Sequence, residues 1–359
     1  MAPSAAAAPA LRDTAAVKAA IKEGFSRETV RLADRVHLVW CGRGSTDGPF
    51  EGNTVVVEQK DGLVVLDAGG APASGAGIVE QIKRLSTKPV RYLIYSHYHG
   101  DHNLGAGEFL KAWPAATIIS TEATRQNMLS HAMDYIKTYG KDHEAMVAFA
   151  TKEKDNPALP EAVRAHWATA ARRGLGMIEA YTGLKAYPAE LTFSDRLTLH
   201  DDEAPVEIAF LGKANTDGDA VVWLPKQRVL ATGDIVVSPV PYASASYPGD
   251  WIAVLQKLKA YDFAVLVPGH GGVQKDRAYL DKLIAALTDI RTRVGPLAAD
   301  KLSVDEIRKR FDEEPLLQAF AGDDRWDRVQ MKGFFLNAIV SNAVKEARGD
   351  AIVQGHDGG

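Results

Sequence analysis

The sequence predicts an α/β (α+β) protein, because two strand-rich blocks are separated by a helical insertion and followed by a helical extension. Short runs rich in Val, Ile and Leu recur in residues 36–66 and again in residues 197–232, with turn residues between them. Residues 121–187 lack this pattern and are dominated by Ala, Met, Lys, Glu and Arg, which favour helices. After residue 273, apolar residues recur at three- and four-residue spacing, as on one face of a helix.

Length and composition limit the classes of protein that this chain represents. Its 359 residues correspond to about two domains of ~150 residues, or to one large domain with an appendage. The net charge of −4 gives no overall electrostatic reason to bind nucleic acid or an anionic membrane. No apolar run approaches the ~18 residues that span a bilayer. A single cysteine, Cys41, excludes a disulfide framework and an all-cysteine metal site.

The same patterns divide the chain into regions. We expect a leader with an N-terminal helix at 1–30, a strand-rich domain at 31–272 with its insertion at about 121–187, a helical extension at 273–350 and a tail at 351–359. Met1–Ala10 is rich in Ala and Pro and lacks the apolar stretch of an export signal, so we expect a cytoplasmic protein. A periplasmic or exported protein with a trimmed signal is the alternative, because Ala-x-Ala is a cleavage pattern.

We expect a short helix near Asp13–Gly24. After it, the first block is predicted to contain strands interrupted by helices. Its expected strands are Val36–Trp40, Asn53–Glu58, Leu63–Asp67, Val90–Ser96 and Ala116–Ser120, and its expected helices are Ile78–Leu85 and Glu108–Trp113. This order of strand, helix and strand is typical of a sheet covered by helices.

The second block repeats this character, and the extension that follows is helical. Its expected strands are Leu197–His200, Val206–Leu211, Ala220–Leu224, Val229–Thr232 and Ala264–Val267, with a helix at Asp250–Ala260. Two apolar stripes follow, one of Leu280, Leu283, Leu287, Ile290 and Val294 and one of Trp326, Val329, Leu336, Val340 and Val344. We expect both stripes to pack on the β core, with a homodimer interface as the alternative.

Metal-ligating side chains are concentrated directly after the expected strand at Val90–Ser96. His97, His99, Asp101 and His102 lie within six residues of one another. Imidazole nitrogens and carboxylate oxygens are ligands that zinc accepts, and a rigid strand fixes the direction of closely spaced ligands. The segment therefore predicts a metal site, and a surface cluster of histidines is the alternative.

This His-x-His-x-Asp-His pattern resembles the metal-binding signature of the metallo-β-lactamase superfamily. Other segments match the family in the expected order, namely Leu66–Gly69, Ala231–Asp234 and Val267–Gly271. The resemblance covers about residues 36–272 and leaves out the insertion and the helical extension. It implies an αββα sandwich of two similar halves, with metal ions at the strand ends between the sheets.

The resemblance also implies which residues hold the metals. One site would use His97 and His99, and the other would use Asp101, His102 and His270, with Asp234 between the two metals. The expected cofactor is one or two Zn2+ ions per chain, with Mn2+ or Fe2+ as alternatives. A metal-bridged hydroxide would then be the nucleophile, and Asp101 would pass a proton to the leaving group.

Two positions bear on this site without a settled role. Asp67 would support the histidine-rich loop, although a carboxylate in a strand-ending turn is an equally good interpretation. The family has histidine in a Gly-x-x-His-Thr-x-Gly-Asp segment, where this chain has Asn215 between Gly212 and Asp219. An amide oxygen is a weaker ligand for zinc than imidazole, so Asn215 as a ligand would weaken the first site.

The expected reaction is hydrolysis of an ester, lactone, thioester or lactam bond in a small molecule. The family's true β-lactamases usually lack the bridging carboxylate, so Asp234 argues against a β-lactamase proper. A phosphoester or sulfate-ester hydrolase is an alternative, although it would need cationic groups, and only Lys213 lies near a motif. An iron-dependent oxygenase and a non-catalytic metal-binding protein are further alternatives.

Two loops supply candidate substrate walls. The loop after the Asp234 strand contains Tyr242, Tyr247 and Trp251, and the loop Cys41–Asn53 contains Phe50, with ordinary packing as the alternative for each residue. The remaining histidines lie outside every motif and are expected to be surface or core residues; they are His37, His131, His143, His166, His200 and His356. Cys41 is expected to be a small buried residue.

Overall fold

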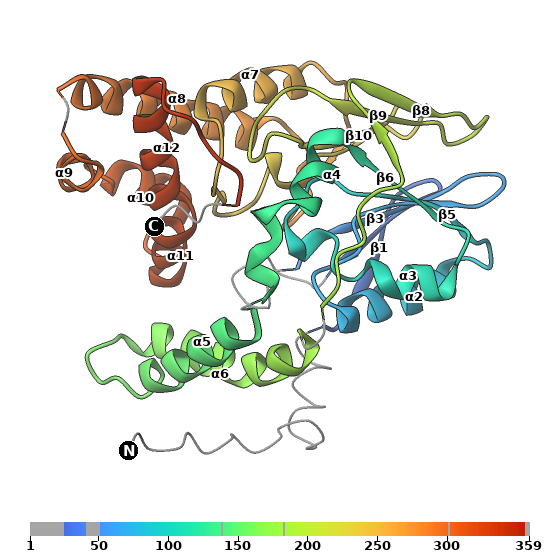
Figure 1. Cartoon of the computed structure of the whole chain (residues 1–359), viewed down its shortest axis with the longest axis horizontal. Helices are drawn as coiled ribbons and strands as arrows, with labels where there is room; N and C mark the ends of the chain where they lie inside the picture. Colours follow the sequence, from blue (N-terminus) through green and yellow to red (C-terminus); the bar gives the residue numbers. More distant parts are fainter. Residues whose placement is uncertain (1–24, 41–50, 138, 182–183, 301, 356–359) are drawn as a thin grey trace.

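Two β-sheets pack face to face, and helices cover the outer face of each sheet (Figure 1). The computed structural model describes residues 25–40, 51–137, 139–181, 184–300 and 302–355. The α/β class, the αββα sandwich and the helical C-terminal region predicted from the sequence are confirmed. The short helix expected near Asp13–Gly24 and the residues Cys41 and Phe50 lie outside the described residues.

The described strands form two mixed sheets. In the first sheet, β1 to β4 run antiparallel to their neighbours, and β4 to β7 run parallel. In the second, β8 to β11 are antiparallel and β12 is parallel to β11. The strands are Glu28–Ala33 (β1), Val36–Trp40 (β2), Thr54–Glu58 (β3), Leu63–Leu66 (β4), Val90–Ile94 (β5), Thr117–Thr121 (β6), Leu191–Phe193 (β7), Arg196–Leu199 (β8), Val206–Phe210 (β9), Ala220–Leu224 (β10), Val229–Ala231 (β11) and Val265–Val267 (β12).

The central strands are apolar on both faces, because both faces of each sheet are covered. Along β3, Val55 and Val57 join the core between the two sheets, whereas Val56 joins the core beneath the outer helices. Strand β10 alternates in the same way, with Val222 between the sheets and Val221 on the outer side. Successive side chains of a strand point to opposite faces of the sheet, so a strand that is buried on both faces needs apolar residues at every position.

The helices are divided among the outer faces, the insertion and the C-terminal region. They are Pro72–Leu85 (α2), Gly100–His102 (η1), Ala106–Ala112 (α3), Glu122–Leu129 (α4), His131–Lys137 (η2), Tyr139–Glu153 (α5), Glu161–Ala180 (α6), Gly233–Ile235 (η3), Pro248–Lys259 (α7), Ala278–Ala299 (α8), Val304–Arg310 (α9), Glu314–Ala321 (α10), Arg325–Gln330 (α11), Met331–Leu336 (η4) and Asn337–Arg348 (α12). Helices α2 and α3 cover the first sheet, and α7 and α8 cover the second.

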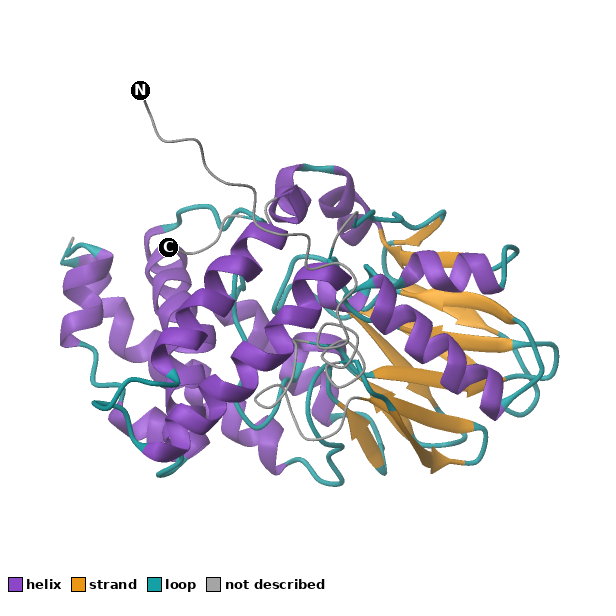
Figure 2. Cartoon of the chain, turned by 90° about the horizontal axis from the view of Figure 1, so that it is seen from below, coloured by secondary structure: helices purple, strands orange, loops and turns teal. Residues whose placement is uncertain are grey.

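The insertion contacts the C-terminal region, although the two are far apart in the sequence. Helices α5 and α6 pack against each other, and α6 contacts α11. The ring of His166 on α6 stacks on Trp326 of α11 with 4.8 Å between centroids, and Trp167 meets the same indole edge-on. Figure 2 shows the helix-rich side of the molecule beside the strand-rich side.

One of the two C-terminal apolar stripes lies where we expect it. The five α8 residues are buried in the core that includes Val221 and Leu266 of the second sheet. In the other stripe, Val329 is 44% exposed, which the constant spacing does not predict. The reason is local: η4 is a π-helix, whose wider turns shift the phase between α11 and α12.

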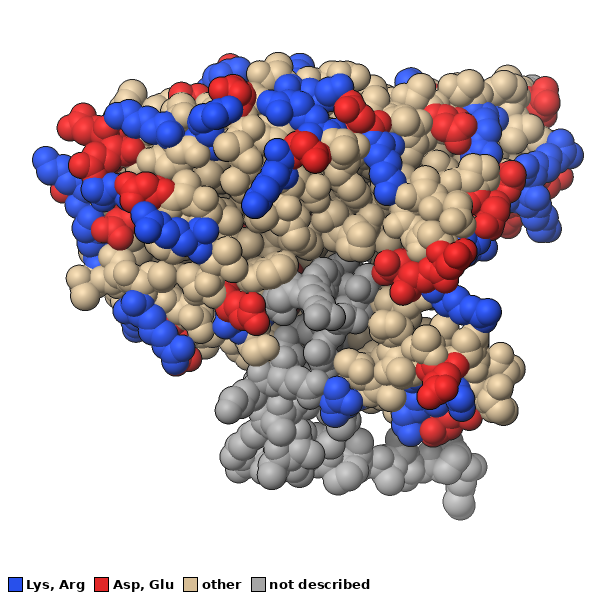
Figure 3. All heavy atoms as spheres, turned by 180° about the vertical axis from the view of Figure 1, so that it is seen from behind, with Lys and Arg blue, Asp and Glu red and all other residues tan. Residues whose placement is uncertain are grey.

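Positively and negatively charged side chains are mixed on the surface, in line with the small net charge of the chain. On the face drawn in Figure 3, Lys and Arg side chains lie among Asp and Glu side chains. In the described part of the chain, no helix has both the length and the apolar character needed to cross a bilayer.

Candidate metal centre

The histidine-rich segment begins where β5 ends, at the carboxyl edge of the first sheet. His97 and His99 follow the strand directly, and the 3-10 helix η1 then carries Asp101 and His102. Asn103 fixes this turn, because its side-chain amide donates to the carbonyl oxygens of Tyr98 and His99 at 2.9 and 2.7 Å. A sequence of six residues thus presents its polar side chains at one strand end.

Two further segments bring ligand-type side chains to this point. Asp234 lies on η3 after β11, and His270 lies in the loop after β12. Both are at the carboxyl ends of neighbouring parallel strands, so they face the same edge of the second sheet. The two sheets therefore meet at a cluster assembled from three distant parts of the sequence.

The ligand-type side chains form two clusters. One of them, called the second cluster here, consists of Asp101, His102, Asp234 and His270. Oδ2 of Asp101 lies 3.3 Å from Nε2 of His102 and 2.9 Å from Nε2 of His270. The two imidazole Nε2 atoms are 3.1 Å apart. These four side chains converge on one point, as the ligands of a single metal ion do.

The first cluster consists of His97, His99 and Asp234. Nε2 of His97 lies 2.9 Å from Nδ1 of His99 and 3.7 Å from Oδ2 of Asp234. In each cluster, the ligand-type atoms lie within 4.8 Å of one another. The structure therefore brings together every His and Asp that the sequence analysis assigned to the metals.

Asp234 is common to both clusters, and its two oxygens face different ones. Oδ1 lies 3.2 Å from Nε2 of His102 and 3.4 Å from Nε2 of His270. Oδ2 faces His97 of the first cluster. A carboxylate in this position can bind two cations at once.

The rings of the imidazoles are oriented by side chains behind them. Nδ1 of His102 contacts Oδ2 of Asp67 at 2.8 Å, and Ser96 Oγ contacts Nδ1 of His97 at 2.9 Å. Nε2 of His99 contacts Ser244 Oγ at 3.3 Å. Each contact leaves the opposite ring nitrogen directed into the cluster, as outer partners of metal-bound histidines do.

Buried opposite charges control ionisation in the second cluster. Burial works against a charge on every member, but the neighbouring partners outweigh it. The Asp101 and Asp234 carboxylates raise the pKa of His102 well above its usual value and that of His270 to about 9. The same imidazoles hold the pKa of Asp101 and of Asp234 below the ordinary range.

The donor set fits divalent metal ions. In the second cluster, His102, Asp234 and His270 are buried around Asp101, and a cation coordinated by these four side chains would balance the charge of the two carboxylates. In the first cluster, burial and then the other imidazoles lower the pKa of His97 well below its usual value, so this ring is neutral and able to ligate.

Asn215 is held in a rigid loop between β9 and β10. Asp219 accepts hydrogen bonds from the backbone N and from Oγ1 of Thr216, at 2.7 and 2.8 Å, and burial raises the pKa of Asp219 to about 8. The Asn215 side chain is fully buried, and neither its oxygen nor its nitrogen has a hydrogen-bond partner within the described residues. Such an amide is left available to a ligand outside the protein chain.

The three aromatic residues suggested as substrate walls have different positions. Tyr242 is half-buried, with its ring centroid 5.8 Å from that of His99. Trp251 is 1% exposed in the core of the second sheet, where it donates to the carbonyl oxygen of Ile235, so the structure does not place it at the clusters.

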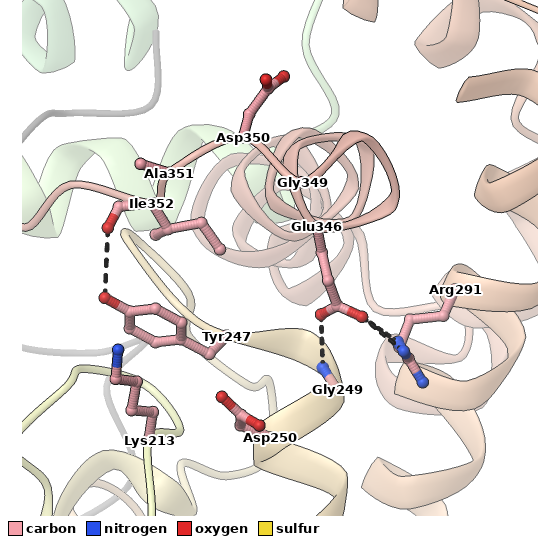
Figure 4. Close-up of a pocket in the computed structure, with 10 residues that line it drawn as sticks. All are labelled: Lys213, Tyr247, Gly249, Asp250, Arg291, Glu346, Gly349, Asp350, Ala351 and Ile352. Atoms are coloured by element: carbon pink, nitrogen blue, oxygen red, sulfur yellow. Dashed lines mark hydrogen bonds and ion pairs between the residues drawn. The ribbon is translucent and has the colours of Figure 1, made fainter. Parts of the chain in front are cut away.

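Tyr247 lines a separate pocket of about 580 Å³ beside the C-terminal region (Figure 4). Its hydroxyl donates to the carbonyl oxygen of Ile352, and Lys213 lies over its ring at 4.8 Å. Glu346 accepts from the backbone N of Gly249 and pairs with Arg291 in the same pocket. Tyr247 and Lys213 therefore both line this pocket.

Three residues around the clusters were missed by the sequence analysis. They are Glu51, Asn53 and Ser244, all of which make hydrogen bonds around the site. Ser244 lies two residues after Tyr242, in a loop that the sequence analysis had selected, but a single serine carries no pattern. Glu51 and Asn53 lie at the end of the other loop suggested as a substrate wall, Cys41–Asn53, but no pattern marks either residue.

Known proteins that resemble this chain in sequence align with it over only part of their length. The chain is 24% identical over 243 residues to a linear primary-alkylsulfatase from a Pseudomonas species, covering 65% of this chain and 44% of that protein. It is 28% identical over 127 residues to a type 2 metallo-beta-lactamase from Bacteroides fragilis, covering 30% of this chain and 51% of that protein. This chain thus spans about half the length of these relatives.

A solved structure and a family model also match the chain. A metallo-beta-lactamase from Pontibacter korlensis has the same fold, with a TM-score of 0.50 and 18% identity, covering 73% of this chain and 99% of that one. The family model described as "Metallo-beta-lactamase superfamily" matches residues 47–270, which is more than half of the chain. With the His97–His102 motif and both clusters inside or at the end of that span, the chain belongs to the metallo-beta-lactamase superfamily of metallo-hydrolases.

Proposed function

We propose that this chain is a hydrolase that binds two divalent metal ions, one in each cluster, with Asp234 shared between them. The observation that carries the proposal is the division of the Asp234 oxygens, because Oδ1 faces the second cluster and Oδ2 faces the first. A cluster that merely balanced charge within the fold would not need a carboxylate aimed at two separate sets of imidazoles. Zn2+ is the ion that this donor set favours, and Mn2+ and Fe2+ also accept it.

The outer contacts determine which ring nitrogen of each histidine serves as ligand. The Nδ1–H of His102 donates to Asp67, so Nε2 is the ligand atom. Ser96 Oγ donates to Asp67 and accepts from Nδ1–H of His97, which again leaves Nε2. In His99 the assignment is reversed, because Nε2 contacts Ser244 and Nδ1 faces His97.

When bound, the two metal ions would supply a deprotonated water as the nucleophile and polarise the bond to be cleaved. The chain's own residues hold the geometry of that attack. Asp101 is the one carboxylate of the second cluster that does not face both metal positions, and its Oδ2 lies between His102 and His270. We assign Asp101 to pass a proton to the leaving group.

Asn215 is proposed as the weak ligand of the first cluster. Its buried amide lacks partners within the described residues, and its loop is fixed by Thr216 and Asp219. A neutral amide oxygen binds zinc less tightly than imidazole does. The first cluster is therefore the site that would lose its ion more readily.

The substrate class proposed first is a small molecule with an ester, lactone, thioester or lactam bond. A bridging carboxylate such as Asp234 favours the esterase-like and lactonase-like chemistry of the superfamily over β-lactam hydrolysis. A sulfate ester is the second candidate, because a linear primary-alkylsulfatase is among the relatives and matches 65% of this chain at 24% identity. Lys213 does not add to this second candidate, since its ammonium lies over the ring of Tyr247.

The experiment compares substrates directly. Metal-free protein would be reloaded with Zn2+ or Mn2+ and assayed on an aryl acetate, a lactone, a thioester, an aryl sulfate, a linear alkyl sulfate, a phosphodiester and a penicillin. We expect metal-dependent turnover that is highest for the carboxylic esters or lactones. Highest turnover for the alkyl sulfate would select the second candidate, and no metal-dependent turnover of any substrate would contradict the proposed function.

A further inference from the structure

A short segment before β3 contacts two of the three parts of the chain that build the second cluster, the part that carries Asp101 and His102 and the part that carries His270. Its residues are Glu51, Gly52 and Asn53, which are all buried. They lie outside the metal motif and supply no ligand atom to either cluster. Asn53 contacts the loop that carries His270, Gly52 contacts Asp101 and His102, and Glu51 contacts the turn that packs behind Asp101.

Asn53 holds the loop that carries His270. Its side-chain amide donates both N–H groups, to the carbonyl oxygens of Pro268 and Gly271, each at 2.9 Å. Its backbone N donates to the carbonyl oxygen of Gly269 at 2.6 Å. The residues on both sides of His270 are therefore bonded to Asn53, which holds the backbone that carries the imidazole.

Gly52 lies directly against Asp101 and His102. Its backbone N donates to the carbonyl oxygen of Asp101 at 3.2 Å. A Cβ atom at this position would lie 2.5 Å from Nδ1 and Cε1 of His102. Glycine is needed here because the backbone of the segment packs against the imidazole, on the ring side that also contacts Asp67.

Glu51 fixes the turn that packs behind Asp101. Its Oε2 accepts from the backbone N of Gly70 at 3.0 Å, from Ser74 Oγ at 2.5 Å and from Arg27 at 2.7 Å. A Cβ atom on Gly70 would lie 2.8 Å from the Cα of Asp101, so this turn touches the ligand's backbone. The Arg27–Glu51 pair is buried on both sides, with 1% and 0% of the side chains exposed.

We propose that Glu51, Gly52 and Asn53 form a positioning segment that sets the ligand geometry of the second cluster. The inference rests on the proposed function, because it concerns one of the two metal sites assigned there. The first cluster has different supports, since His97 is oriented by Ser96 and His99 by Ser244. Loss of the segment's bonds should therefore weaken metal binding at the second cluster and leave the first unaffected.

The test measures metal binding at each cluster separately. Asn53→Ala would be made in two backgrounds, His97→Ala/His99→Ala, which retains the second cluster, and Asp101→Ala/His270→Ala, which retains the first. The matched control is Gln59→Ala, because the Gln59 amide is also buried and also donates to two backbone carbonyls, those of Leu199 and Ala204. Zn2+ affinity would be measured by competition with a chelating dye, together with thermal unfolding.

We expect Asn53→Ala to weaken Zn2+ binding about 10–100-fold in the background that retains the second cluster, as loss of outer supports does. It should leave affinity unchanged in the other background, and Gln59→Ala should leave affinity unchanged in both. Asn53→Ser, which retains one donor, should show a smaller loss and provides a second test if the alanine variant does not fold.

Equal losses in both backgrounds, or no loss in either, would overturn the inference, because the segment would then serve the fold alone. Failure of the proposed function has a different signature. In that case the unsubstituted protein itself would bind no Zn2+, before any change at Asn53.

Discussion

Nδ1 of His102 lies 2.8 Å from Oδ2 of Asp67, and both side chains are almost completely excluded from solvent. The same carboxylate accepts from the backbone N and from Oγ of Ser96, each at 2.8 Å. Asp67 has a positive φ of 64°, a conformation that aspartate and asparagine adopt more readily than most residues. Of the two interpretations of Asp67 made from the sequence, the contacts favour support of the histidine-rich loop.

Replacing Asp67 by asparagine should weaken metal binding without distorting the backbone. Asparagine tolerates the positive φ, but an amide offers one acceptor oxygen where the carboxylate offers two. We expect about a 10–100-fold loss of Zn2+ affinity, the usual effect of removing such a partner. Metal competition with a chelator measures it, and unchanged affinity in Asp67→Asn would show that the His102 contact does not matter for binding.

Asp101→Ala should abolish hydrolysis while leaving the fold intact, because the Asp101 side chain is 16% exposed and takes no part in the apolar core. His102→Ala should also abolish hydrolysis, but with lower thermal stability, since it leaves the buried Asp67 without its imidazole partner. The control is Asp305→Ala, an exposed carboxylate on α9. Wild-type turnover by either variant with metal still bound would contradict the assignment.

Asn215→His should tighten metal binding at the first cluster. We expect dialysed wild-type protein to retain closer to one metal equivalent than two, with activity rising as Zn2+ or Mn2+ is added back. Imidazole at this position would supply the donor that zinc prefers, so the variant should hold two equivalents. Elemental analysis after dialysis gives the answer. Two equally tight equivalents in the wild type, unchanged in the variant, would show that another residue supplies the ligand.

On the proposed function, penicillins and carbapenems should be poorer substrates than esters, because Asp234 would be the bridging carboxylate. The measurement is kcat/KM on a penicillin, a lactone, an aryl acetate and an alkyl sulfate with the same metal-loaded preparation. A higher kcat/KM for the β-lactam than for all three others would contradict this expectation.

Below neutral pH, the free energy of unfolding should increase with pH, and His37 on β2 should contribute to this increase. Burial, and then the charge of Arg31, lower the pKa of His37 below its usual value. Between the folded pKa and about 6.5, the unfolded chain binds a proton that the folded protein does not, so the free energy of unfolding increases with pH and levels off above that range. His37→Gln should flatten this slope in urea unfolding measured across the window. An unchanged slope would assign it to other groups.

The two candidate clusters could be predicted from the sequence because most of their residues are close together along the chain. His97 to His102 share one strand end, so their proximity in space follows from their proximity along the chain. The role of Asn53 could not be predicted, since its bonds reach Pro268 and Gly271, 215 and 218 residues away. No residue pattern marks a contact of that kind.

Other differences from the sequence analysis have local causes. Strand β1 was missed because none of its residues is buried and it shows no alternation, and β7 because only one of its three residues is buried. Trp251 belongs both to the loop suggested as a substrate wall and to the helix expected at Asp250–Ala260, and in the structure it begins an apolar repeat with Val254, Leu255 and Leu258 that buries α7. For that aromatic residue, helical spacing was the better guide.

The link from Asn342 through Ser244 to His99 bears on how small a working version of this protein can be made. Asn342 on α12 donates to the carbonyl oxygen of Ser244, whose hydroxyl contacts Nε2 of His99. The residues that the family model matches end at 270, before α12 begins. A minimal fragment cut at that boundary would keep every ligand, yet the loop that orients His99 would lose its anchor. A fragment that keeps this support of His99 therefore has to include α12.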